Sequence, residues 1–184
     1  ILDGGSADNA EPLITGKGNT ITLTDVILQN NRSNQNGSAI CLAGAGTSLT
    51  ATDLAVKNCE TTGYGTIYFN KSGNAAKSIS LTNAVFENNT ALGGSAVYFT
   101  RTDSGLASAT FSGCSFIRNK SASSGNLSTI DEALQSSNVI YVNDNGNEAT
   151  VSFEGTTTFS QNTTNAELSI AAEHKASVWF QKEF

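Results

Sequence analysis

The stretch Thr24–Asn31, TDVILQNN, recurs as Thr82–Asn89, TNAVFENN, and this repeat decides the fold. Thr52–Cys59 (TDLAVKNC) and Ser112–Asn119 (SGCSFIRN) fit the same frame, and Thr156–Asn162 is a looser copy. Self-similarity at a fixed period is typical of repeat architectures. The apolar anchors of the five copies are separated by 28, 30, 30 and 43 residues; they are Leu28, Val56, Phe86, Phe116 and Phe159.

Two further columns of sequence run in step with these anchors. One contains Gly37–Leu42, Gly65–Phe69, Gly94–Phe99 and Asn138–Val142, and the opening pair Leu13-Ile14 fits it one period earlier. The other consists of short alternating segments at 21–23, 49–51, 79–81, 109–111 and 151–153. Each unit therefore predicts three brief strands broken by Gly, Asn and Ser turns. Helical spacing does not explain apolar residues at i and i+2.

A unit of 28–30 residues with three short strands cannot bury its apolar face alone, whereas stacked units can. The neighbouring coils then pair their strands in parallel at a spacing of about 4.8 Å. Because parallel crossovers are almost always right-handed, the sequence predicts an all-β, right-handed parallel β-helix. We expect about six coils of 28–30 residues.

The repeat also predicts which side chains point inward. The anchors form an inner column of aliphatic and aromatic residues. The positions two residues before four of them also point inward, and Cys114 is expected to be a small buried hydrophobe like its neighbours Val26, Leu54 and Ala84. Asn recurs at the following turn, where side-chain amides can bond up and down the stack. This Asn column, which Cys59 interrupts, is Asn31, Asn89, Asn119 and Asn162.

Composition excludes several functional classes. The net charge of −6 makes nucleic acid an unsuitable partner. No apolar run approaches the ~20 residues of a transmembrane helix. The opening Ile1–Gly5 is neither an initiator Met nor a signal peptide, so we interpret residues 1–184 as one β-helix segment of a larger protein. Residues 166–184 lose the repeat frame and are expected to form an irregular last coil or a cap.

The paired motifs at Phe86–Asn89 (FENN) and Gly93–Val97 (GGSAV) resemble the F-x-x-N and G-G-A-[ILV] repeats of chlamydial polymorphic membrane proteins. F-x-x-N recurs at Phe116–Asn119 and Phe159–Asn162, and the resemblance covers residues 13 to 165. The copies depart from the family pattern where Leu28 and Val56 replace Phe, and no segment reads G-G-A. The resemblance implies an exported bacterial surface protein, in the outer membrane or cell wall or secreted, that acts in adhesion and virulence.

Enzymatic chemistry has little support in the sequence. β-Helices include pectin-degrading enzymes, so a polysaccharide-degrading enzyme is the alternative. Such chemistry needs clustered carboxylates for Ca²⁺ with a basic residue, or a carboxylate pair at a set separation. Asp25 and Asp53 are in register, but Asn83 and Gly113 continue their column. The lone His174 supports no triad and no zinc site. We predict a non-enzymatic protein without catalytic residues, metal or cofactor. The three cysteines leave one disulfide open.

A second alternative is an ice-binding face. Outward hydroxyls on successive coils would form such a face, and they align in the third column, although outward Ser and Thr also suit an ordinary solvated strand. The aligned residues are Thr22, Thr50, Ser80, Thr110 and Ser152.

Two features are candidates for binding. Tyr68, Tyr98 and Tyr141 follow Cys41 in an outward column, where the rings can contact sugars or a partner protein. A ladder of rings that stiffens the sheet is the competing interpretation. The other candidate is an inserted loop at 120–138, with a short helix expected at 128–135. It contributes Leu127, Ile130, Asp131 and Glu132 as candidate binding residues.

The sequence thus predicts a β-helical adhesin or surface-display segment. It would bind a host-cell surface protein or glycan through the tyrosine column or the inserted loop. Alternatively, it would serve as a stalk that holds another domain away from the cell.

Overall fold

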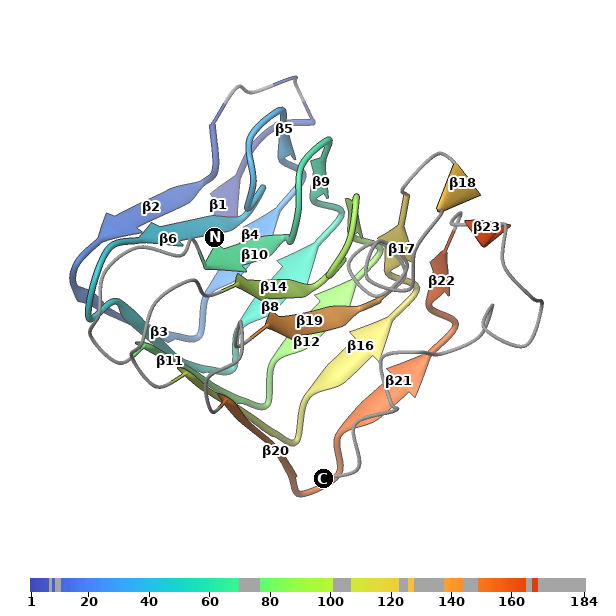
Figure 1. Ribbon diagram of the computed structural model, residues 1–184. Helices are drawn as coiled ribbons and strands as arrows, with labels where there is room; N and C mark the ends of the chain where they lie inside the picture. The colour runs from blue at the N-terminus through green and yellow to red at the C-terminus, as the bar shows by residue number, and fades with distance from the viewer. Residues whose placement is uncertain are drawn as a thin grey trace.

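Short strands that all pair in parallel build the molecule, as the computed structural model shows. The structure describes residues 1–6, 8, 11–69, 77–100, 107–122, 126–127, 138–143, 149–164 and 167–168. These residues form a parallel β-solenoid and contain no helix. In Figure 1 the chain advances along the stack from blue to orange, and each strand lies beside its equivalent from the next coil.

Four sheets run along the solenoid. The anchor sheet has six strands: β1 (Leu2–Asp3), β4 (Ile27–Gln29), β8 (Ala55–Lys57), β12 (Val85–Glu87), β16 (Ser115–Ile117) and β21 (Thr158–Ser160). The tyrosine sheet has five: β2 (Ile14–Lys17), β6 (Ile40–Ala43), β10 (Ile67–Phe69), β14 (Val97–Thr100) and β19 (Ile140–Asn143). These two sheets correspond to the anchor column and to the Gly-led column of the sequence.

The hydroxyl sheet corresponds to the short alternating segments. Its strands are β3 (Thr20–Thr24), β7 (Ser48–Thr52), β11 (Lys77–Thr82), β15 (Ala107–Ser112) and β20 (Ala149–Glu154). The corner sheet consists of two-residue strands that follow the Asn turn: β5 (Arg32–Ser33), β9 (Glu60–Thr61), β13 (Thr90–Ala91), β17 (Lys120–Ser121) and β22 (Thr163–Thr164).

The register between coils follows the sequence repeat. Leu28 pairs with Val56, which pairs with Phe86, and Phe116 and Phe159 continue the column. The first four anchors are fully buried, and Phe159 is partly buried against the same core. The Phe116 ring stacks between its neighbours, with centroids 5.1 Å from Phe86 and 4.8 Å from Phe159. The predicted inner column is therefore confirmed.

The second predicted inward position is also confirmed. Leu54, Ala84 and Cys114 are at most 1% exposed, and Val26 is partly buried against the core. The interior is thus a stack of layers in which each coil covers the apolar residues of the next. Because dispersion contacts depend on close packing, this stacking stabilises coils that would be unstable alone.

The corners of the coils need left-handed backbone, which explains their residue types. Asp25, Asp53 and Asn83 have φ of 53°, 53° and 54° at the corner between the hydroxyl and anchor sheets. Only Gly and, less readily, Asn and Asp adopt this region at low cost. Gly113 and Gly155 hold the equivalent position in the next coils, with φ of 62° and 58°. The left-handed backbone thus explains why this column contains Asp, Asn and Gly.

Two predictions about the coils were wrong. About three turns, not six, have the complete form, at residues 20–43, 48–69 and 77–100. The first strands and the coils beyond residue 107 are partial or interrupted. Each complete coil has four strands where three were predicted. The corner strands were missed because two residues are too short to show an alternating pattern.

The C-terminal part of the chain departs from the repeat. β23 (Glu167–Leu168) does not extend any of the four sheets; it pairs with β18 (Asn126–Leu127) in a separate two-stranded sheet. Most of the region 166–184, expected to be a last coil or cap, lies outside the described residues.

Candidate functional site

The predicted tyrosine column exists as a cluster of rings on the tyrosine sheet. Tyr68, Tyr98 and Tyr141 are in register on β10, β14 and β19. The Tyr98 ring lies 5.7 Å from the Tyr68 ring and 4.6 Å from the Tyr141 ring, both stacked. The insert before Tyr141 therefore does not disturb the register. Cys41 begins the column in the preceding coil, opposite Tyr68.

A fourth ring joins this cluster. Tyr64 lies in the turn before β10, and its ring centroid is 4.6 Å from that of Tyr98. The Asn36 side chain accepts a hydrogen bond of 2.8 Å from the Tyr64 backbone N–H. The sequence contained only a weak signal for Tyr64, because the repeat places no aromatic residue at that turn in the other coils.

The cluster presents ring edges more than ring faces. Tyr98, at its centre, is only 6% exposed, while the other three rings are half-buried. Burial raises the pKa of both Tyr68 and Tyr98, so their hydroxyls stay protonated and can donate hydrogen bonds. The stacking agrees with the ring-ladder interpretation for Tyr98. Tyr64, Tyr68 and Tyr141 are only partly buried, so part of each residue stays accessible to a ligand.

Glycines beside the cluster allow its close packing. A Cβ atom at Gly65 would lie 2.5 Å from the Ile67 carbonyl oxygen and 2.7 Å from the Tyr98 Cβ. A Cβ at Gly94 would lie 2.6 Å from the Val97 carbonyl oxygen. Both glycines also have positive φ, of 63° and 56°. Gly65 and Gly94, which begin two copies of this column, are therefore required by the backbone and by the adjacent Tyr98.

The inserted loop is only partly described. Asn126 and Leu127 form β18, whose backbone pairs with Glu167 and Leu168. The other candidate residues of the loop, Ile130, Asp131 and Glu132, lie outside the described residues, as does the helix expected at 128–135.

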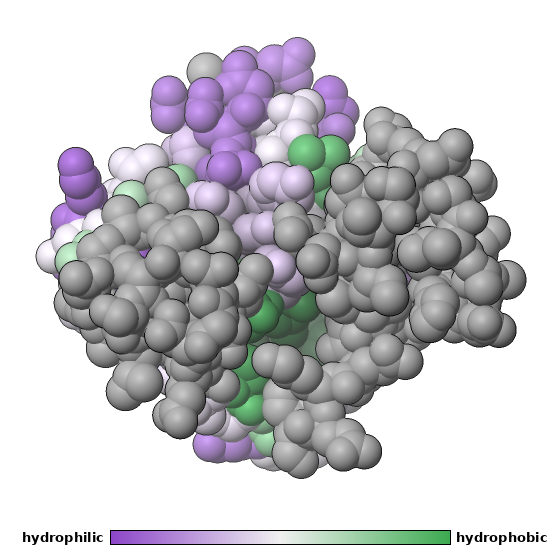
Figure 2. Space-filling model, in the orientation of Figure 1, coloured by the Kyte–Doolittle hydropathy of each residue, from purple (hydrophilic) through white to green (hydrophobic). Residues whose placement is uncertain are grey.

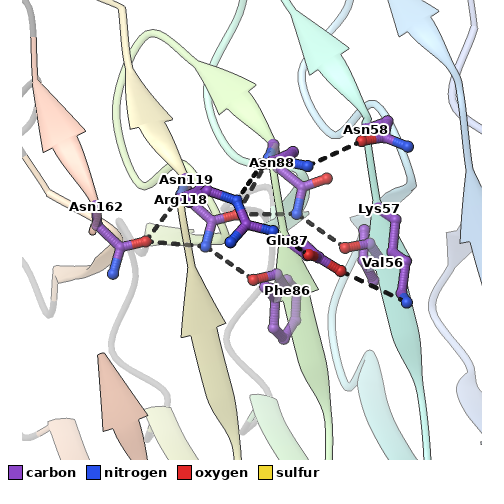
Figure 3. Close-up of polar contacts among 10 residues, drawn as sticks. Val56, Lys57, Asn58, Phe86, Glu87, Asn88, Arg118, Asn119 and Asn162 are labelled. Carbon is purple, nitrogen blue, oxygen red and sulfur yellow. Dashed lines mark hydrogen bonds and ion pairs between the residues drawn. The ribbon is translucent and has the colours of Figure 1, made fainter. Parts of the chain in front are cut away.

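The Asn column of the sequence is a buried amide ladder, here called the inner ladder (Figure 3). Asn89 and Asn119 are 0% exposed. The Asn119 Oδ1 accepts bonds from the Asn89 backbone N–H (3.2 Å) and Nδ2 (2.9 Å). The Asn119 Nδ2 donates to the Phe86 carbonyl (3.0 Å) and to the Asn162 Oδ1 (3.1 Å). The structural role predicted for this column is confirmed.

Cys59 interrupts the inner ladder as predicted. Its backbone N–H donates to the Asn89 Oδ1 at 3.0 Å, but its thiol offers only long contacts to the Leu28 and Lys57 carbonyls. Burial raises the pKa of the Cys59 thiol to about 11. Burial also raises the pKa of Cys114 and Cys41. All three cysteines are free, which answers the question of a disulfide.

A second amide column, here called the outer ladder, lies on the solvent side of the same turn. It consists of Asn30, Asn58 and Asn88, whose φ values are 56°, 52° and 55°. The Asn58 Nδ2 donates to the Asn30 Oδ1 (3.2 Å), and the Asn88 Nδ2 donates to the Asn58 Oδ1 (3.4 Å). At one end Arg118 Nε donates to the Asn88 Oδ1 at 2.9 Å (Figure 3). At the other end Asn30 Nδ2 donates to the Asp3 Oδ2 at 3.1 Å.

An ion-pair network flanks the outer ladder on the anchor sheet. Glu87 lies between two cations, with Lys57 Nζ at 3.5 Å from its Oε2 and Arg118 Nη2 against its Oε1. These residues come from three successive coils (Figure 3). Because the network is exposed, it orients side chains more than it stabilises the fold.

A shallow groove of about 230 Å³ opens beside the outer ladder. It lies at the turn between the anchor and corner sheets and spans three coils. Its polar lining includes Asn30, Asn58, Asn88, Arg32, Glu60 and Thr90. Figure 2 shows hydrophilic residues gathered at the top of the molecule, over β5. The repeated doublets Asn30-Asn31 and Asn88-Asn89 were the signal that could have revealed this second column.

The hydroxyl sheet carries Ser and Thr at nearly every outward position. The register extends the predicted column to three parallel columns, broken only by Glu154. They are Thr20, Ser48, Ser78, Ser108 and Thr150; Thr22, Thr50, Ser80, Thr110 and Ser152; and Thr24, Thr52, Thr82 and Ser112.

The described residues contain no group of three or more His, Cys, Asp or Glu side chains that could hold a metal ion. Asp25 and Asp53 occupy exposed corners, and the Asp53 carboxylate accepts a 3.2 Å bond from Asn83 of the next coil. Within the same ranges, no helix has the length and hydropathy of a membrane span.

Comparisons of the chain with models of protein families, with curated proteins and with solved structures give no match. The similarity to the chlamydial repeats therefore rests on the short motifs alone.

Proposed function

We propose that the chain is a non-enzymatic, right-handed β-helical segment of an exported bacterial surface protein that acts in adhesion. It either binds a host-surface protein or glycan directly or serves as a stalk for another domain. The likeness of its repeats to those of chlamydial polymorphic membrane proteins supports export and surface location. The lack of a strong acidic cluster at Asp25 and Asp53, whose side chains suit left-handed corners, supports a non-enzymatic role.

The observation that carries the direct-binding proposal is the tyrosine cluster. Four rings from three coils and a turn meet around Tyr98 on an outward sheet face. Tyrosine rings combine apolar area with a hydroxyl that can form hydrogen bonds, as at many protein and sugar interfaces. The parallel register between coils holds the rings in place without a ligand, so little order is lost on binding.

A binding screen tests this proposal. The chain, Tyr68→Ala, Tyr141→Ser and a variant lacking residues 121–137 would be applied to host cells and to a glycan array. Loss of binding in one variant that keeps its urea-unfolding midpoint would locate the site. Equal binding by all variants would contradict a tyrosine or loop site, and no binding by any would favour the stalk.

Ice binding is a second candidate, and the three hydroxyl columns favour it. Neighbouring strands lie about 4.8 Å apart and alternate residues about 6.6 Å apart, so the hydroxyls form a regular lattice that can order water. The test is growth of ice crystals in the presence of the chain and of Thr50→Lys. Thr62→Lys, on an exposed turn outside the sheet, is the matched control. Inhibition lost only in Thr50→Lys would support the candidate, and no inhibition by the unchanged chain would remove it.

A further inference from the structure

The groove beside the outer ladder is lined mainly by polar side chains that could bind a ligand. Three carboxamides line it, one from each of three successive coils. Their mutual hydrogen bonds, together with Arg118 at one end and Asp3 at the other, fix the orientation of each amide plane. A ligand would therefore meet groups that are already ordered, which lowers the entropic cost of binding.

The ladder leaves bonding capacity unused on each member. A carboxamide has two N–H donors and two acceptor lone pairs. The Asn58 side chain donates one hydrogen bond to Asn30 and accepts one from Asn88. Asn58 and Asn88 are exposed, so the remaining donor and acceptor of each can reach a ligand in the groove.

The charges in the groove exclude several ligand classes. The Arg32 Nε lies 3.3 Å from the Glu60 Oε2, and its Nη1 lies 3.9 Å from the Asp8 Oδ1. The two carboxylates balance the charge of the guanidinium, so the groove does not favour an anion. A divalent cation would need more free carboxylates than Glu60 supplies, and no metal-binding group occurs within the described ranges. The groove is thus suited to a neutral ligand.

Backbone pairing excludes an added peptide strand. At this turn the N–H groups of Asn58, Glu60 and Thr90 already donate to carbonyls of adjacent coils, at 3.0, 2.8 and 2.9 Å. An extended peptide binds a sheet through free backbone groups at an edge. Only side chains are available here, and they recur along the axis at the coil spacing of about 4.8 Å.

We propose that this groove binds a neutral, linear glycan, with the outer-ladder amides bonding hydroxyls of successive sugars. Each free amide donor and acceptor would pair with neighbouring hydroxyls of one sugar, while Thr90 and the Arg32–Glu60 pair border the chain. The volume of about 230 Å³ is below that of sites that enclose a drug-sized ligand, so the glycan lies along the groove. This inference rests on the proposed adhesive function and names its ligand class.

The test follows side-chain amide resonances in the ¹⁵N-labelled chain during titration with cellotriose, chitotriose, mannotriose and maltotriose. The proposal predicts saturable shifts of the Asn30, Asn58 and Asn88 amide signals with at least one of the four. The double variant Asn58→Gly/Asn88→Gly keeps the left-handed backbone, and it should weaken binding by about tenfold or more, as the loss of one or two hydrogen bonds requires.

The matched control is Asn83→Gly. Asn83 has φ of 54°, is exposed and bonds to Asp53 of the preceding coil, but it lies at the opposite end of the anchor strand. This variant should bind as the unchanged chain does. Thr90→Val, which removes a groove hydroxyl at constant shape, gives a second variant should the double glycine variant fail to fold.

The outcomes separate this inference from the adhesive function. Absence of shifts with all four probes overturns the glycan groove, and the cell-binding screen then still judges adhesion. Binding that survives in the double glycine variant but is lost in Tyr68→Ala overturns the groove while supporting adhesion through the tyrosines. Equal weakening in Asn83→Gly shows a general loss of structure and also contradicts the proposal.

Discussion

The two amide ladders at the same turn use the same residue type for opposite purposes. Asn89 points into the solenoid and is 0% exposed. It bonds to the backbone of the preceding coil and to the Asn119 side chain of the next coil. The side chain of Asn88, the residue before Asn89, is exposed and bonds to the side chains of Asn58 and Arg118. A buried amide must satisfy its groups within the protein, whereas an exposed one can exchange its partners for water or a ligand. Burial, not residue type, therefore separates the structural ladder from the candidate binding ladder.

The largest expected effect comes from breaking the inner ladder. Asn119→Ala removes the acceptor of the Asn89 N–H and the donor to the Phe86 carbonyl, both in the interior. Because each orphaned buried group costs about 1–3 kcal/mol, we expect a loss of about 3 kcal/mol or more in the free energy of unfolding. Urea unfolding measures it. Asn83→Gly is the control at an exposed corner, and equal losses in the two variants would contradict the comparison.

The next effect depends on pH and on the cysteine in the inner ladder. The pKa of the Cys59 thiol is raised from 9.0 to about 11. Between pH 9 and 11 the unfolded chain loses this proton and the folded chain keeps it, so stability falls as the pH rises through that window. From pH 8 to pH 10.5 the unchanged chain should lose about 2 kcal/mol more than Cys59→Ala. Parallel pH slopes for the two proteins would show that Cys59 is not responsible.

A smaller effect separates the contribution of backbone conformation to stability from that of the side chain at Asn58 in the outer ladder. Asn58 has φ of 52°, where a residue with a Cβ and no local polar group is strained. Asn58→Ala should therefore destabilise by about 1 kcal/mol, while Asn58→Gly should change stability by less than about 0.5 kcal/mol. Thermal unfolding of the two variants measures the difference. Similar losses in both variants would mean that the exposed amide, and not the backbone conformation, stabilises the turn.

The smallest effect concerns the ion pairs beside the outer ladder. Glu87→Gln removes the carboxylate between Lys57 and Arg118, at the surface of the anchor sheet. We expect a loss of about 0.5 kcal/mol that disappears at high salt, because exposed pairs are weak and screened. Unfolding in low and high sodium chloride tests this. A loss that persists at high salt would indicate a packing role for Glu87.

Features that repeat at strand positions could be predicted from the sequence, whereas features formed by the corners of the coils could not. Phe86 and Phe116 gave the inner column, and Asn89 and Asn119 the inner ladder, because burial limits these positions to few residue types. The same repeat placed Tyr68, Tyr98 and Tyr141 in one register. The number of complete coils was overestimated because each recognisable motif was counted as a whole coil.

The candidate groove was missed in the sequence for a physical reason, although the doublets Asn30-Asn31 and Asn88-Asn89 carried a signal of its amide column. Exposed corners need only left-handed backbone, so after Asn58 and Asn88 the column continues with Arg118 and Gln161, whose φ values are 53° and 55°. This variation hides the column. The groove also depends on corner strands such as Arg32–Ser33 and Glu60–Thr61, which are too short to predict. Tyr64 escaped notice because it belongs to a turn and reaches the cluster only through folding.

Hydrogen exchange of the side-chain amides tests the contrast between the two ladders most directly. In the ¹⁵N-labelled chain, the Nδ2 protons of Asn89 and Asn119 should exchange only when the solenoid opens, with protection close to that of the anchor-strand backbone. The Nδ2 protons of Asn58 and Asn88 should exchange almost as fast as those of a free amide. Equal protection of the two sets, or rapid exchange at Asn89 and Asn119, would contradict the division between a structural inner ladder and a solvent-facing outer one.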